Sequence, residues 1–187
     1  MSTETSEKEI LKQYGTVMHY VQESTKQVFG TMLNLDVECG QVRCDTRTSI
    51  QSAGIVAMVG MAGAISGNGC LCFSKSFACQ LASRFLMAEY PEVCDDVLDA
   101  VAELSNMVVG GLKTVLEEGS GPMGLSVPTV VCGESYLTRT APIGDRFVLD
   151  FSCNNGQDEF SITVCLITEQ KNRNYLRELA EFHARLV

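Results

Sequence analysis

A carboxylate and a carboxamide stand three residues apart in the segment DAVAELSNMVVGG, residues 99–111. Side chains at positions i and i+3 of a helix are neighbours on its surface, so Glu103 and Asn106 would lie side by side. An uncharged carboxamide is no general base, but it can accept a hydrogen bond from a water molecule and donate one at the same time. The pair therefore combines an anionic group with a group that can orient water.

The element that must position this pair is a long helix, predicted from Pro91 to about Glu118. At 100° per residue, aliphatic side chains fall within about 60° of Val101, on a stripe suited to packing; they are Val97, Leu104, Val108, Leu112 and Val115. The opposite direction collects polar or small residues within about 40°; they are Asp99, Glu103, Asn106, Gly110 and Glu117.

A solvated outer face is the ordinary interpretation of such a polar stripe. Two features of the sequence favour a functional role for this stripe. Asparagine is a mediocre helix former, and glycine in a helix costs on the order of 1 kcal/mol relative to alanine. Gly110 and Gly111 would leave a smooth groove that the backbone of another protein could approach closely.

The remaining periodicities predict helices on either side of β-rich segments. The predicted elements are a helix over 4–29 that stops at Gly30; strands within 36–73 with a turn at Gly67-Asn68-Gly69; a helix over 74–90 capped by Ser74 or Ser76; strands at 127–133, 135–142, 145–153 and 158–168, the last two joined by a hairpin at Asn154-Asn155-Gly156; and a terminal helix over 170–186. This order predicts one α+β domain over residues 1–187, with long helices packed on a largely antiparallel sheet.

Composition excludes several classes of partner. The chain has 187 residues, is 45% hydrophobic and carries a net charge of −9. Its lysines and arginines are scattered, which argues against a nucleic-acid surface, and an acidic chain gains nothing from anionic lipid. The polar N-terminus shows no secretory signal, and the longest apolar run, 53–65, is too short to span a bilayer. We therefore expect a soluble, cytoplasmic protein with no membrane contact.

Nine cysteines do not indicate disulfides here, because the count is odd and several, such as Cys132, Cys153 and Cys165, stand in apolar runs. No metal site is expected either, since the close pairs lack the CxxC spacing of zinc ligands. A hydrolase with Cys94 or Cys132 as nucleophile remains an alternative, although neither has a histidine nearby in the sequence.

The segment Glu103-Leu104-Ser105-Asn106-Met107, continued by Gly110 and followed by VPTVVCG at 127–133, resembles the CheC/CheX/FliY group of phosphatases, which act on phosphorylated CheY. Their mark is a glutamate followed three residues later by an asparagine, in a helix closely preceded by acidic residues. The resemblance runs from about residue 10 to 168. CheC proteins generally carry two such helices, whereas the first helix here offers Glu23 and then Lys26. A single site is similar to CheX.

The resemblance implies an aspartyl-phosphate phosphatase whose substrate is a CheY-type response regulator. Asn106 would position the attacking water, Glu103 would form a salt bridge to the receiver's invariant lysine, and Asp99 and Gly110 are candidate contacts around them. It implies Mg²⁺ bound in the partner receiver, with no cofactor or metal of the chain's own. It also implies a homodimer whose sheets join across the subunit boundary. The terminal helix predicted at 170–186 is not part of the minimal family domain. It could cover the sheet edge through which the two subunits would join.

One alternative function for a protein of this fold is binding without catalysis. Flagellar switch subunits share the architecture and bind receivers without hydrolysing the phosphate. The intact Glu103 and Asn106 pair favours hydrolysis over this docking role.

Overall fold

The computed structural model describes residues 2–45, 49–139, 145–153 and 158–168. Its helices are α1 (Ser2–Leu33), α2 (Lys75–Leu86) and α3 (Asp95–Ser120); its strands are β1 (Val37–Cys44), β2 (Ser49–Gly63), β3 (Ile65–Phe73), β4 (Met123–Leu125), β5 (Thr129–Arg139), β6 (Asp145–Cys153) and β7 (Glu159–Thr168). The predicted α+β class, with long helices and a largely antiparallel sheet, is confirmed. None of the helices in these ranges is long and apolar enough to cross a membrane.

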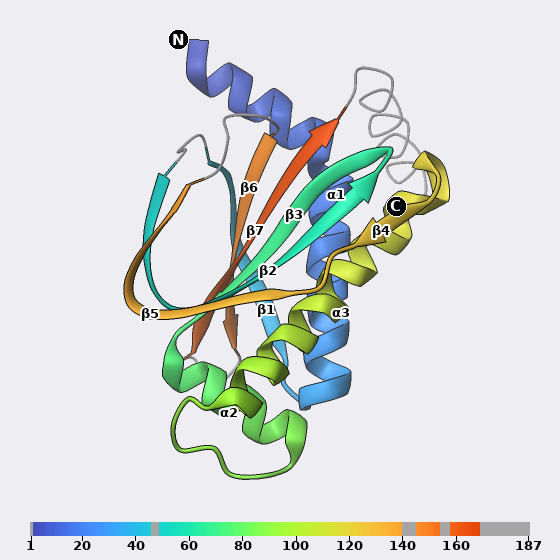
Figure 1. Cartoon of the computed structure of the whole chain (residues 1–187). Helices are drawn as coiled ribbons and strands as arrows, with labels where there is room; N and C mark the ends of the chain where they lie inside the picture. Colours follow the sequence, from blue (N-terminus) through green and yellow to red (C-terminus); the bar gives the residue numbers. More distant parts are fainter. Residues whose placement is uncertain (1, 46–48, 140–144, 154–157, 169–187) are drawn as a thin grey trace.

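The seven strands form one sheet in the order β1-β6-β7-β3-β2-β4, with β5 also paired to β2. All the pairings are antiparallel. The long strand β2 serves two neighbours on one edge, β5 along its first part and β4 at its end. Figure 1 shows α1 and α3 side by side along the sheet and α2 across one end of it.

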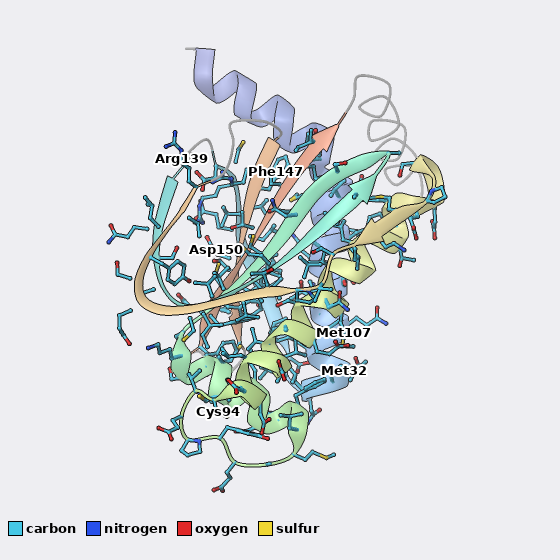
Figure 2. The ribbon with its side chains drawn as sticks, viewed as in Figure 1. Met32, Cys94, Met107, Arg139, Phe147 and Asp150 are labelled. Carbon is cyan, nitrogen blue, oxygen red and sulfur yellow. The ribbon has the colours of Figure 1, made fainter. Side chains whose placement is uncertain are left out.

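The core lies between the helices and the sheet. Alternate residues of β6 turn the same way, and Phe147, Leu149 and Phe151 are all buried. Helix α1 supplies an aromatic partner, because the ring centroid of Tyr14 lies 4.8 Å from that of Phe147; Figure 2 labels Phe147. The buried stripe of α3 closes the same core, which fixes which side of α3 faces outward.

Helix α1 runs past Gly30, where the sequence predicted its end, and stops at Leu33. Phe29 and Leu33 are 0% and 3% exposed, so core packing continues through the glycine. A single helical glycine costs only about 1 kcal/mol, less than burying two large apolar side chains contributes. The chain turns at Asn34 instead, which adopts a positive φ of 48°.

Gly67, Asn68 and Gly69 lie inside β3, so the predicted turn there is wrong. The chain turns at residue 64, between β2 and β3. Each glycine is explained by close approach instead. A Cβ at position 69 would lie 2.5 Å from Cγ2 of Val109 in α3, and one at position 67 would meet the carbonyl oxygen of Cys165.

Other boundaries are confirmed or corrected by local contacts. Ser74 caps α2 by accepting a hydrogen bond from Phe77 N at 3.1 Å, as predicted. Helix α3 begins at Asp95 with Cys94 as N-cap, so Pro91 lies in the preceding turn rather than in the helix. Where two strands were predicted, at 127–133 and 135–142, the described residues form one strand, β5, over Thr129–Arg139; residues 140–142 lie outside the described residues. The predicted hairpin at 154–156 and the terminal helix at 170–186 lie outside the described residues.

Candidate active site

Helix α3 presents one wholly buried face and one open face. The aliphatic residues of the buried face, at 0–1% exposure, are Val97, Val101, Leu104, Val108, Leu112 and Leu116. The predicted stripe is confirmed except at its end, where Leu116 is buried and Val115 only half-buried. Because this stripe packs against the sheet and α1, the helix cannot rotate without exposing it.

The four predicted site residues all lie on the open face. Asp99 and Glu103 are exposed, and Asn106 and Gly110 are half-buried. The side chains of Glu103 and Asn106 make no hydrogen bond or ion pair to any residue within the described part of the chain. Ser105, between them, points inward and donates to the Val101 carbonyl at 2.8 Å. A carboxylate and an amide are thus left free, side by side, on a rigid element.

The first turn of α3 adds negative charge to this face. Asp95 and Asp96 occupy it, where carboxylates are stabilised by the helix dipole. The hydroxyl of Tyr90 donates to Asp96 at 3.2 Å. With Asp99 and Glu103 following at helical spacing, the open face is acidic along its first half, which suits a cationic group on a partner.

The two glycines of α3 have different surroundings, which corrects the prediction of a shared smooth groove. A Cβ at Gly110 would meet only Leu125 Cδ1, at an ordinary 3.8 Å. A Cβ at Gly111 would lie 2.9 Å from Cβ of Ser24 in α1 and closer still to its hydroxyl oxygen. Ser24 donates to the Val108 carbonyl of α3 at 3.0 Å. Gly111 therefore serves close packing between two helices, and only Gly110 belongs to the open face.

The sequence did not predict that β4 borders this face. Met123 N donates to Glu117 Oε1 at 2.7 Å, and Leu125 lies opposite Gly110. Glu117 also pairs with Lys113 at 2.7 Å, and these two donors lower the pKa of the Glu117 carboxyl. Glu117 thus holds β4 against α3 and, unlike Glu103, is not free. The only pattern that the sequence analysis noted next to β4 is the VPTVVCG segment, which follows it in the chain.

No group of three or more potential metal ligands occurs within residues 2–45, 49–139, 145–153 and 158–168. None of the nine cysteines, all of which lie in these ranges, forms a disulfide. Burial raises the pKa of the Cys70 thiol to about 12 and that of Cys153 to about 11, so neither is a thiolate at neutral pH. Cys132 is exposed, although it stands in an apolar run of the sequence.

We expect alkylation with iodoacetamide at neutral pH to modify Cys94 and Cys132, which are exposed, and to spare Cys70 and Cys153. Mass spectrometry of the peptides gives the sites. Because the family resemblance assigns the chemistry to Glu103 and Asn106 rather than to a thiol, the hydrolytic activity that it implies should be unchanged. Loss of activity in step with alkylation of either exposed thiol, and its retention in the Cys94→Ser or Cys132→Ser variant after alkylation, would instead support a cysteine mechanism.

The fold agrees with that of known proteins. Residues 55–152, which are 98 of the 187, match the family model of the chemotaxis phosphatase CheX. The chain belongs to the CheX family. The family match covers α3 whole, with Glu103 and Asn106, and most of the long β2 and all of β5.

Relatives show how far this likeness extends. The CheY-P phosphatase CheX of Thermotoga maritima is 32% identical over 87 residues, 46% of this chain and 56% of that protein. The chain thus spans about half the length of this curated relative. CheX from Desulfovibrio desulfuricans has 23% identity and a TM-score of 0.71, covering 80% of this chain and 98% of its own. CheX of Borrelia burgdorferi, in a complex with CheY, BeF₃ and Mg²⁺, has 19% identity and a TM-score of 0.65, covering 80% and 97%. These structures share the fold of the CheX family.

Proposed function

We propose that this protein hydrolyses the aspartyl phosphate of a CheY-type response regulator. The observation that carries the proposal is the free pair of Glu103 and Asn106 on the open face of α3, in a chain of the CheX family. The Thermotoga relative is named as a CheY-P phosphatase, and the Borrelia relative forms a complex with CheY. Both support the choice of an acyl phosphate on a receiver domain as the substrate.

In this mechanism α3 enters the receiver's phosphorylation site, and Asn106 orders the attacking water. The amide oxygen accepts a hydrogen bond from the water and the amide NH₂ donates one, which holds the water oxygen in line with phosphorus. The water oxygen forms the new bond to phosphorus while the bond to the aspartyl oxygen breaks, which releases inorganic phosphate and the free carboxylate. The water's proton passes to the phosphate oxygens, so no general base is needed.

Glu103 would set the register of the helix through an ion pair to the receiver's invariant lysine. Its carboxylate has no partner of its own among the described residues, so pairing breaks no existing contact. Asp99 and Gly110, one turn to either side of the pair, are proposed to contact the receiver. The Mg²⁺ that neutralises the phosphate belongs to the receiver, as the composition of the Borrelia complex suggests, and the chain is proposed to bring no cofactor of its own.

We also propose that the protein is a homodimer with sheets joined between subunits, as the family resemblance implies, and that it meets its receiver in the cytoplasm.

The proposal is tested by the decay of radiolabelled phospho-receiver with and without the purified protein, over a panel of receivers from the same cell. Acceleration for at least one receiver is expected. Binding to the phosphorylated receiver without any acceleration would favour the rival docking module of the flagellar-switch type.

Glu103→Ala should weaken binding to the phosphorylated receiver at least about fivefold, since an ion pair at an exposed interface rim contributes about 1 kcal/mol and one that is desolvated contributes more. The dephosphorylation rate at subsaturating protein should fall with it. Titration calorimetry and the decay assay measure the two effects. Glu118→Ala is the matched control, because it removes the same charge from an exposed position elsewhere on α3 and should leave both unchanged. Equal affinity for the two variants would remove Glu103 from the interface.

A further inference from the structure

The segment formed by β4 and the two residues after it, Met123–Val127, runs along the side of α3 that carries Asn106. We call it the strap. It begins at Met123, bonded to Glu117, and its third residue, Leu125, lies opposite Gly110. The strap therefore runs toward the N-terminus of α3 as its own numbering rises. Figure 1 shows β4 beside the second half of α3, leading into β5.

From the contact between Leu125 and Gly110, the direction of the strap leads toward the level of Asn106. From Gly110 back to Asn106 the helix rises about 6 Å, at about 1.5 Å per residue. From Leu125 to Val127 an extended chain advances by about 6.6 Å, at about 3.3 Å per residue. On this ideal geometry the two steps are similar, which puts Val127 near the level of Asn106. The helical wheel agrees, because Asn106 and Lys113 point to the same side of α3 as Glu117, which binds the strap.

The end of the strap is held in place by Ser126. Its backbone N–H donates to the Gly60 carbonyl at 2.9 Å, and its hydroxyl accepts from Gly60 N at 2.8 Å and donates to the Val127 carbonyl at 2.9 Å. Two of these bonds tie the strap to β2, and the third fixes the peptide of Val127 itself. Because a backbone segment held this way loses little conformational freedom on binding, the strap is organised for contact before a partner arrives.

Val127 is nevertheless 85% exposed. A scattered exposed valine needs no explanation, but this one follows a serine that makes three hydrogen bonds, and ideal geometry puts it near the level of the amide proposed to order water. An apolar side chain at that place would be covered by whatever covers Asn106. Covering it would also exclude water next to the ion pair of Glu103, which strengthens that pair.

We propose that Val127 is a docking contact for the phosphorylated receiver, packing on an apolar part of the rim of its phosphorylation site. This inference rests on the proposed function and extends it. Asn106 serves the reaction and Glu103 the register, whereas Val127 contributes affinity with no part in the chemistry. Ser126 is the residue that positions it.

The test uses the full chain and a receiver loaded with beryllofluoride and Mg²⁺ for binding, and the same receiver phosphorylated for turnover. Val127→Ser should raise Kd and KM about tenfold, the cost of no longer burying a valine, with kcat unchanged within about twofold. Val127→Ile should bind like the original chain. Leu137→Ser is the matched control, since Leu137 is 67% exposed and lies two residues before Arg139, the last residue of β5, which Figure 2 labels far from the strap. It should change neither constant.

Ser126→Ala provides an independent variant, because it removes the hydroxyl bonds and leaves Val127 in the chain. It should weaken binding by a smaller factor, about threefold, the scale of one or two modest hydrogen bonds. Equal Kd values for Val127→Ser, Leu137→Ser and the original chain would overturn the docking role, while the proposed function would stand as long as Asn106→Ala loses turnover. If the original chain neither binds nor dephosphorylates any receiver, the proposed function and the docking role both fail.

Discussion

Asn106→Ala is expected to lower the dephosphorylation rate of a saturated receiver at least about 10²-fold while leaving its binding nearly intact. Ordering one water in line with phosphorus is a positioning effect, and such effects reach this size because the reacting groups no longer have to find each other. The amide makes no bond to the rest of the described chain, so its removal should not disturb α3. Single-turnover decay of radiolabelled receiver at saturating protein measures the rate.

Thr114→Ala is the control for this variant, because Thr114 is exposed on the same helix and its hydroxyl donates to the Gly110 carbonyl within that helix, at 3.0 Å. It should turn over at the original rate. Undiminished turnover by Asn106→Ala would refute water positioning by this residue, even if Glu103 and Val127 proved to bind the receiver.

Gly111→Ala is expected to destabilise the fold by about 2 kcal/mol, whereas Gly110→Ala should stabilise it by up to about 1 kcal/mol. The first methyl group meets Ser24 across the contact between α1 and α3, and overpacking of this kind typically costs about 1–3 kcal/mol. The second meets only ordinary van der Waals contact, so alanine's better helix propensity remains. Urea unfolding at constant m-value measures both free energies.

The adjacent glycines make each variant the control for the other. Ser24→Gly removes both atoms that the new methyl would strike, so combining it with Gly111→Ala should recover part of the loss as a measurable coupling energy. If Gly110→Ala and Gly111→Ala changed stability equally, the close approach of α1 and α3 at this point would be wrong.

Sequence patterns correctly predicted the features that depend on residues close together in the chain. The strands at 145–153 and 158–168, the cap at Ser74 and the open face of α3 all follow from alternation, capping and helical period, and each is confirmed by the fold. Helical periodicity alone predicts that Glu103 and Asn106 face outward, because the aliphatic stripe around Val101 fixes the orientation of the helix. That these two residues carry the chemistry stays a prediction.

The predictions that failed concern features that depend on contacts between segments far apart in the sequence. Gly69 signals a turn in the sequence, but it is needed because Val109 of α3 packs onto it. Gly30 signals a helix end, yet core packing by the residues around it continues the helix to Leu33. Likewise Gly111 packs against Ser24, and nothing in the sequence of either helix shows that they meet there. The strap was missed for the same reason, since the bonds that hold it come from α3 and β2.

The most direct measurement is the structure of this protein bound to a receiver carrying beryllofluoride and Mg²⁺. The receiver's phosphorylation site should lie over α3, with the Asn106 amide within hydrogen-bonding distance of a water in line with beryllium, and the Glu103 carboxylate within about 4 Å of the receiver lysine. A receiver seated elsewhere, with Glu103 and Asn106 still open to solvent, would contradict the account.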